Sequence, residues 1–482
     1  MTRRSLPAEA PDLDRQQRIF VNRNLRLTSA RAIGFDLDHT LAIYKPIPFE
    51  RLAFDQAKRK LVERGYPREV LRLRHDHAFV IRGLIVDRQR GNILKMDRHH
   101  YVVQAYHGTR KLPPEMRKGL YTTKHIRVTG QTYASVDTLF SLPEISLFAQ
   151  LVDLADAERG RPNYRRLYED VRTVVDEAHA DGSIKNAIAR APLRYLEIDP
   201  NLPATLNRML GHGVRLFLLT NSEAAYTDLI MDQLLSGTLP QRPHWTDCFD
   251  LVAVRARKPD FFARHDPLVP LDPRALGATR RGARFAFSGG SVVALERALG
   301  VAGDRVLYFG DHTYGDILRS KRSRGWRTAM IIQELADELR HQSAARQRWR
   351  EIEALERRID RLGAWRDFLE RARDGEVSGA IVSGYLRERG LRSGARQIRS
   401  QLESIREQLR ELERDTDARE AEVEAVFNPY WGPIFRAGRE ISHFGNQVED
   451  FACIYTGRVS NFLHYPMDKY FVTPHAAMPH EV

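Results

Sequence analysis

The stretch Phe35-Asp36-Leu37-Asp38-His39-Thr40-Leu41 places two carboxylates directly after an apolar run, Ala32 to Phe35. A short apolar run of this kind is typical of a strand that is buried on both faces. Open α/β sheets gather their binding and catalytic groups at the carboxyl ends of such strands. The stretch therefore predicts an α/β fold with Asp36 and Asp38 at the end of a central strand.

Three later segments also end an apolar strand in polar groups. They are Leu216 to Leu219 followed by Thr220, Asn221 and Ser222; Phe249 to Val254 followed by Lys258 and Pro259; and Val306 to Gly310 followed by Asp311 and, five residues on, Asp316. An Asp-x-Asp pair alone also occurs in calcium loops and surface turns. The ordered set of four is much more specific than any one member.

These four segments resemble the four motifs of the haloacid dehalogenase superfamily of phosphotransferases. The resemblance implies that Asp36 attacks phosphorus and carries an aspartyl phosphate, while Asp38 protonates the leaving oxygen and then activates water. It also implies Mg2+, because a phosphate dianion would repel an attacking carboxylate unless cations neutralise the site. The implied metal ligands are Asp36, Asp311 and the backbone carbonyl of Asp38, and Asp316 would support the metal site directly or through water.

The resemblance assigns further residues to the phosphoryl group. Thr220 and the amide of Asn221, with Ser222 beside them, would hold its non-bridging oxygens, and Lys258 would balance charge on the nucleophile and the phosphoryl group. Each residue also has a purely structural interpretation. A strand-end Asp is a common helix N-cap, Lys258 fits a solvated turn, and Thr220 to Ser222 can cap the next helix. The four motifs together favour catalysis.

Nearly the whole chain, from about Phe20 to Phe471, resembles the cytosolic purine 5'-nucleotidase family within this superfamily. The segments that carry the resemblance are Phe20 to Leu25, Gly34 to Lys45, Arg82 to Leu84, Gly91 to Lys95, Leu139 to Glu144, Ser288 to Ser291 and Gly325 to Thr328. The sequence departs from the family at His39, where Tyr is expected, and lacks the acidic C-terminal tail of the mammalian enzyme. These departures concern regulation and subunit contacts rather than the chemistry.

The insert between the first two motifs carries the residues expected to bind the substrate. Arg172, Asp176 and His179 are spaced by four and three positions, so they share one face of a predicted helix. Taken alone, the spacing fits a surface ion pair between Arg172 and Asp176, with His179 uninvolved. The resemblance instead implies that this face binds a hypoxanthine or guanine base, that Phe140 stacks on it and that Lys185 reaches the phosphate.

Length and composition fit an enzyme with one large core and an inserted domain. The chain has 482 residues, of which 42% are hydrophobic. Cys248 and Cys453 lie far apart and offer neither a metal-ligand spacing nor a disulfide framework, which favours a reducing compartment. No apolar run approaches about 18 residues, and residues 1–17 lack the apolar segment of a signal peptide. We expect a cytoplasmic protein that does not bind membranes.

The net charge of +13 can attract nucleic acid or steer small anionic nucleotides towards a cleft. From Arg340 to Glu424, however, arginines alternate with glutamates. Apolar residues recur in this region every three or four positions, as at Ile398, Leu402 and Ile405. The pattern predicts a helical hairpin with an apolar seam and solvated charged faces, so nucleic acid is not an expected partner.

Four regions make up the predicted organisation. They are an N-terminal arm, 1–30; a Rossmann-like haloacid dehalogenase core with a parallel sheet, 31–45 and 200–340; an inserted α+β cap, 46–199; and a helical C-terminal region with a coiled-coil-like hairpin, 341–482. The aromatic-rich segment 451–471 is expected to pack on the core or on a second subunit.

The sequence thus predicts a Mg2+-dependent 5'-nucleotidase that hydrolyses purine nucleoside 5'-monophosphates such as IMP and GMP, and that can also transfer the phosphoryl group to another nucleoside. Two alternatives stay open: a phosphatase for another phosphate monoester, and a weakly catalytic scaffold or nucleic-acid-associated protein. We also expect a homo-oligomer, a dimer or tetramer. The resemblance implies a nucleotide effector site near the fourth motif, where Tyr314 and Arg322 match; without it, both are ordinary packing and surface groups.

Overall fold

The computed structural model divides into two compact units, one formed by residues 1–337 and 434–482 and the other by residues 338–433. Within them it describes residues 13–122, 126, 128, 130–158, 162–277, 285–388, 390 and 394–474. Residues 1–12 of the predicted N-terminal arm lie outside the described part of the chain. The rest of the predicted arm belongs to the first unit.

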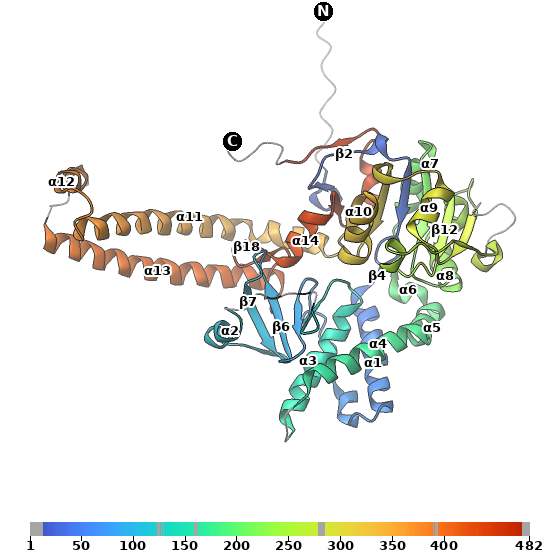
Figure 1. Ribbon diagram of the computed structural model, residues 1–482, viewed down its shortest axis with the longest axis horizontal. Helices are drawn as coiled ribbons and strands as arrows, with labels where there is room; N and C mark the ends of the chain where they lie inside the picture. The colour runs from blue at the N-terminus through green and yellow to red at the C-terminus, as the bar shows by residue number, and fades with distance from the viewer. Residues whose placement is uncertain are drawn as a thin grey trace, which may run out of the picture. The chain divides into compact units, whose positions relative to one another are not determined.

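A nine-stranded sheet forms the centre of the first unit (Figure 1). Its strands, in spatial order, are β1 (Phe20–Val21), β19 (Ile454–Thr456), β16 (Arg327–Ile331), β15 (Val306–Gly310), β3 (Ala32–Phe35), β11 (Arg215–Leu219), β12 (Leu251–Val254), β14 (Phe285–Ser288) and β13 (Val269–Pro270). Only the edge strands β1 and β13 pair antiparallel. The seven strands between them are parallel, which confirms the predicted α/β class.

The strands of the sheet centre are apolar throughout because both of their faces are buried. On β3, Ile33 and Phe35 face one core cluster, and Ala32 faces another. Gly34 lies so close to the next strand that a Cβ there would be 2.1 Å from the ring of Phe217. The helix α7 (Leu202–Gly211) precedes β11, and the helices α8 (Ala224–Leu235), α9 (Val292–Leu299) and α10 (Arg319–Arg324) come after β11, β14 and β15.

Residues 46–199 form an insert whose two ends lie side by side. β4 (Ile43–Tyr44) precedes the insert and pairs antiparallel with β10 (Leu196–Glu197), at its end. In its described residues the insert contains a five-stranded antiparallel sheet and six α-helices. The sheet, in spatial order, is β8 (Arg110–Lys111), β7 (Val102–His107), β6 (Asn92–Met96), β5 (Ile85–Asp87) and β9 (Tyr133–Ser135). The helices are α1 (Pro46–Glu63), α2 (Pro114–Tyr121), α3 (Ser141–Ala157), α4 (Tyr164–Ala180), α5 (Ser183–Arg190) and α6 (Pro192–Tyr195).

The C-terminal segment 434–482 belongs to the first unit, whereas the sequence grouped it with the preceding helices. It contains β17 (Arg436–Ala437), β18 (Glu440–Ile441), α14 (His443–Phe451), β19 and β20 (Tyr470–Phe471). β19 extends the parallel sheet beside β16, and β20 pairs with β2 (Leu25–Arg26). The ring of Phe462 packs on Phe309 with centroids 4.9 Å apart. These strands of two or three residues are too short for a periodicity that sequence patterns can detect.

The second unit is a long helical hairpin. Its helices are α11 (Leu335–Arg373), which begins at the end of the first unit, α12 (Gly379–Glu388) and α13 (Ala395–Phe427). α11 and α13 lie side by side, with α12 at the turn (Figure 1). Ile398, Leu402, Ile405 and Leu409 of α13 are buried in the seam, as the spacing predicted. Ion pairs such as Arg406 with Glu370 (2.7 Å) flank the seam.

None of the helices in the described residues combines enough length with enough apolar character to cross a membrane.

Candidate active site

The four predicted motifs meet at the carboxyl ends of the central strands. Asp36 follows β3, Thr220 follows β11, Lys258 lies in the loop after β12, and Asp311 follows β15. Asp316 lies on the π-helical turn η8 (Thr313–Leu318). Because β3 lies between β11 and β15 in the sheet, the polar groups that follow these strands adjoin one another.

Lys258 is the centre of the charged cluster. Its Nζ lies 2.8 Å from Asp36 Oδ1 and 2.7 Å from Asp316 Oδ1, and it donates to the hydroxyl of Tyr308 at 3.0 Å. Burial alone would lower the pKa of Lys258, but attraction to Asp316 and Asp36 outweighs it, so the pKa is raised and the ammonium stays charged. The lysine therefore offsets part of the negative charge of the acids around it.

Asp36, Asp311 and Asp316 form a group that can hold a metal ion. All three are buried, and one carboxylate oxygen of each lies within 4.8 Å of the others. Asp311 Oδ2 is buried and has no hydrogen-bond partner. Burial and the charge of Asp316 raise the pKa of Asp311 to about 8, against the attraction of Arg82 and Lys258. Lys258 and Arg82, which is itself paired with Glu334, do not balance this many buried acids, and clustered carboxylate oxygens suit a hard ion such as Mg2+.

The pKa of Asp36 is also raised, chiefly by burial. Lys258 opposes this shift, while the carboxylates of Asp316, Asp311 and Asp38 add to it. Added positive charge at the cluster would therefore favour the ionised form of Asp36, which is the form that can act as a nucleophile.

Two hydroxyl groups fix the carboxylate of Asp38. Tyr44 donates to Oδ1 at 2.6 Å and Ser222 donates to Oδ2 at 2.8 Å. The hydroxyl of Tyr44 also lies 2.9 Å from that of Tyr226. Sequence reasoning missed both tyrosines. It placed Ser222 with the phosphoryl ligands, whereas in the structure its hydroxyl binds Asp38.

The second motif, Thr220 to Ser222, contacts the loop that carries Lys258. The side chain of Asn221 accepts from the Lys258 main-chain N–H at 2.6 Å and donates to the Lys258 carbonyl at 3.0 Å. Thr220 is buried, and its hydroxyl oxygen accepts from the Ser222 main-chain N–H at 3.0 Å. The side-chain amide of Asn221 therefore positions the lysine, and a contact from Asn221 to a phosphoryl oxygen falls to its main-chain N–H.

Arg82 links the insert to the acid cluster and was not predicted as a site residue. It is buried, donates to the carbonyl oxygen of Asp311 at 2.9 Å, and forms a two-pronged ion pair with Glu334 at 2.7 and 2.6 Å. The only sequence signal was its place in the segment Arg82 to Leu84. A contact across more than two hundred residues cannot be inferred from that segment.

A cavity of about 470 Å3 opens onto the acid cluster and extends to the helices of the insert. Its lining includes Asp36, Asp38, Lys258, Asp311 and Asp316 together with all the predicted base-binding residues, which are Phe140, Arg172, Asp176, His179 and Lys185. Asn221 and Ser222 also line it. Residues predicted for phosphate chemistry and for base binding thus share one space.

The predicted helical face is formed by α4. Arg172 pairs with Asp176 through Nε and Oδ2 at 3.4 Å, so the surface ion pair considered as an alternative exists, although both side chains also line the cavity. Arg172 donates from Nη1 to Glu144 Oε2 at 3.0 Å. Burial raises the pKa of Glu144 to about 7, an effect that Arg172 opposes. Oε1 of Glu144 is buried without a partner, which makes this acid a further cavity group that the sequence reasoning passed over.

The aromatic and cationic groups beside α4 are closely packed. The ring of Phe140 contacts His179 edge-on at 5.5 Å and His39 at 4.6 Å between centroids. Burial, with the neighbouring Lys185, lowers the pKa of His179, so its ring is neutral at physiological pH. Lys185 lies on α5 with Nζ 5.5 Å from the ring centroid of Tyr226.

The two predicted effector residues lie on consecutive helical segments outside this cavity's lining. Tyr314 is on η8, 40% exposed, and its hydroxyl accepts from Arg319. Arg322 is exposed on α10, with its guanidinium carbon 5.8 Å from the ring centroid of Phe451. The effector role stays a prediction.

The parallel sheet carries the acids and the lysine of the predicted motifs at the carboxyl ends of its strands, which is the arrangement expected of a hydrolase of the haloacid dehalogenase type. The chain belongs to the 5' nucleotidase family, whose sequence profile matches residues 19–482. It is therefore a 5'-nucleotidase hydrolase. The match includes the strands of the central sheet, the insert and both compact units.

Relatives that match nearly the whole chain carry the same family name. The chain is 29% identical to the 5'-nucleotidase domain-containing protein 2 of Homo sapiens over 99% of this chain and 87% of that protein. It is 28% identical to a 5'-nucleotidase domain-containing protein of Dictyostelium discoideum, over 98% and 76%. Among solved structures, a predicted phosphoglycolate phosphatase from Haemophilus somnus is similar over 63% of this chain and 85% of that chain, with 12% identity and a TM-score of 0.28.

Proposed function

We propose that the chain hydrolyses purine nucleoside 5'-monophosphates, IMP and GMP above all, with Mg2+ and through an aspartyl phosphate at Asp36. Another nucleoside can accept the phosphoryl group in place of water. The observation that carries the proposal is the single cavity lined both by the acid and lysine cluster and by the Arg172, Asp176 and His179 face of α4.

The reaction would proceed in two steps. A carboxylate oxygen of Asp36 bonds to phosphorus as the bond from phosphorus to the 5' oxygen breaks, and Asp38 gives its proton to that oxygen. Asp38 then takes a proton from water, which displaces Asp36 from phosphorus and releases phosphate. The hydrogen bonds from Tyr44 and Ser222 hold Asp38 in one orientation through both steps.

Positive charge and hydrogen bonds would hold the phosphoryl group. Lys258 lies against Asp36 and can balance charge on both the nucleophile and the phosphoryl oxygens. The main-chain N–H of Asn221 is suited to the non-bridging oxygens, whereas Thr220 is fully buried outside the cavity lining, so its contact with the phosphoryl group stays a prediction. Mg2+ bound by Asp36, the carbonyl of Asp38, Asp311 and Asp316 would supply the charge that lets a dianion approach a carboxylate.

The chemistry of the α4 face favours 6-oxopurines. Arg172 offers donors to a carbonyl oxygen such as O6, and Asp176 offers an acceptor to the N1–H of hypoxanthine or guanine. Adenine has a donor in place of O6 and no proton on N1, so both groups would lose their partners. Phe140 provides the apolar surface on which a base can stack.

A substrate panel tests the proposal. Purified protein is incubated with IMP, GMP, AMP, UMP and a sugar phosphate, with and without Mg2+, and phosphate release is measured. IMP and GMP should be the best substrates, Mg2+ should be required, and Asp36→Asn should abolish release because it removes the nucleophile. Preference for the sugar phosphate would show that the protein is instead a phosphatase for another phosphate monoester. No release of phosphate from any ester would refute the proposal.

A further inference from the structure

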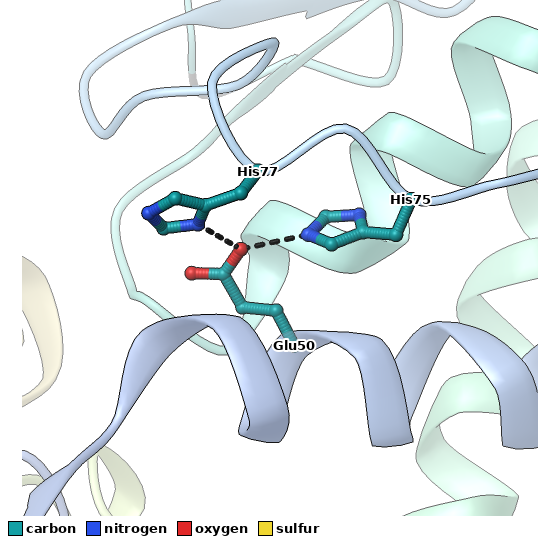
Figure 2. Close-up of side chains that lie close together, drawn as sticks. All are labelled: Glu50, His75 and His77. Carbon is teal, nitrogen blue, oxygen red and sulfur yellow. Dashed lines mark hydrogen bonds and ion pairs between the residues drawn. The ribbon is translucent and has the colours of Figure 1, made fainter.

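A second cluster of metal-ligating side chains lies in the insert, apart from the acid cluster. Glu50 projects from α1, and His75 and His77 lie on the loop that follows the short helix η3 (Arg68–Arg72) (Figure 2). His75 Nε2 and His77 Nδ1 both lie 2.8 Å from the same oxygen, Glu50 Oε2. One ligand atom from each of the three residues therefore lies within 4.8 Å of the other two, with both histidine nitrogens directed at the Glu50 oxygen.

Glu50 is buried without a strong cationic partner. Its side chain is 4% exposed, and among the described residues its ion-pair partners are the two histidines alone. Burial alone would raise the pKa of Glu50, but the hydrogen bonds from His75 and His77 outweigh it and lower the pKa. A buried carboxylate of this kind is suited to a cation that binds it directly.

The loop that carries the histidines is held in place independently of Glu50. Lys58 of α1 donates to the carbonyls of Leu71 and Leu73 at 3.3 and 2.7 Å, and Gln150 of α3 donates to the carbonyl of Arg74 at 3.0 Å. The ring of His75 packs against Phe54 with centroids 5.2 Å apart. The ligand atoms are thus positioned before any ion arrives, which lowers the entropic cost of binding.

We propose that Glu50, His75 and His77 bind a first-row transition-metal ion of the Zn2+ class. Two histidines and one carboxylate are a common zinc ligand set that leaves a fourth position open. The side chain of His77 is 46% exposed, which gives the ion a path from solvent. In a tetrahedral site, ligand atoms at about 2.0–2.1 Å from zinc lie roughly 3.3 Å apart, so the nitrogens need to move outward by about 0.5 Å.

The site would join two segments that flank the active-site cavity. Glu50 follows Phe49, which lines that cavity and contacts Phe140 with ring centroids 5.5 Å apart. His77 lies five residues before Arg82, which donates to the carbonyl of Asp311. A bound ion therefore ties the start of α1 to the segment that supports the acid cluster.

Zinc titration of the full-length chain in excess Mg2+ tests the proposal, with Asp311→Asn introduced to weaken the acid cluster. One Zn2+ per chain should bind, and Glu50→Gln and His77→Asn should each weaken it at least about tenfold, since even loss of an outer partner costs about 10- to 100-fold. The exposed His265→Asn serves as the control and should bind as before. X-ray absorption at the zinc edge should show two imidazole ligands.

Either of two results would overturn the site. One is equal zinc affinity in the parent, Glu50→Gln and His77→Asn proteins, each shown to be folded by circular dichroism. The other is a zinc-edge spectrum without imidazole ligands. Because the readout is binding, its result is separate from that of the phosphatase panel.

Discussion

Asp38 shows how single residues prepare the site. Both of its carboxylate oxygens accept hydrogen bonds from hydroxyl groups, one from Tyr44 and one from Ser222. Tyr44 is itself buried, and burial together with the charge of Asp38 raises the pKa of its phenol, so it stays a donor. An acid and base held at both oxygens does not have to reorganise during proton transfer.

Ser222→Ala tests this arrangement. It removes the donor to Asp38 Oδ2, and a hydrogen bond to a charged group contributes about 1.5–3 kcal/mol, so kcat should fall about tenfold or more. KM should change little if Ser222 acts through Asp38 rather than on the substrate. Steady-state kinetics on the best substrate of the panel measures both, with the exposed Ser29→Ala as control. An unchanged kcat would contradict this role of Ser222 and would show that the hydrogen bond from Tyr44 alone holds Asp38.

Asp311 makes the metal-free protein sensitive to pH. Its pKa is raised to about 8 in the folded state, against an ordinary value of about 3.9 in an unfolded chain. Between about pH 4 and 8 the folded state therefore binds more protons than the unfolded state, so stability falls as pH rises. Mg2+ needs ionised carboxylates, and its stabilising effect should be larger at about pH 8 than at about pH 6.

Thermal unfolding with and without Mg2+ at these two pH values measures the effect. The metal-free protein should have the lower Tm at the higher pH, and the gain in Tm with Mg2+ should be greater there. If Mg2+ raised the Tm equally at both pH values, metal binding would not depend on the ionisation of the buried acids, and the prediction would be wrong.

At the scale of elements, the close approach of β15 and η8 places the fourth motif. β15 ends at Gly310, and a Cβ at this position would lie 2.5 Å from the Cβ of Asp316. Asp316 in turn pairs with Lys258 at 2.7 Å. Glycine is thus required before Asp311 because the turn of helix that carries the second acid packs directly on the strand end.

Gly310→Ala should consequently damage both stability and activity. The added methyl group forces Asp316 away from Lys258, and overpacking of this kind costs about 1–3 kcal/mol. Gly119→Ala is a matched control, because Gly119 lies exposed in α2 with open space around it and should be neutral or slightly stabilising. Urea unfolding compares the two variants. Equal free energies of unfolding would contradict the packing argument.

Elements with a strong local pattern were predictable from the sequence. The apolar strands before Asp36, Thr220 and Asp311 and the seam of α13 are long or regular enough to leave a signal. β19 was not predictable, because its three residues join the sheet only through pairing with β16, far away in sequence. The sequence placed the segment 451–471 on the core or on a second subunit, but its grouping of residues 341–482 into one region did not anticipate that 434–482 belongs to the first unit.

At the scale of the whole molecule, the site is assembled from distant parts of the first unit. The motif resemblance could bring Asp36, Lys258 and Asp311 together, since the strand-end rule places all three at one edge of the sheet. It could not supply the bond from Ser222 to Asp38 or the bond from Arg82 to Asp311, which join residues 184 and 229 positions apart. Such contacts depend on side-chain placement in the folded core, which local patterns do not encode.

Chemical trapping of the intermediate tests the central claim most directly. Protein turning over IMP with Mg2+ is reduced with borohydride, which converts an aspartyl phosphate to homoserine, and its peptides are analysed by mass spectrometry. The expected result is homoserine at position 36 alone, and none without IMP. Steady phosphate release with Asp36 unmodified, or with the modification on another acid, would contradict the account.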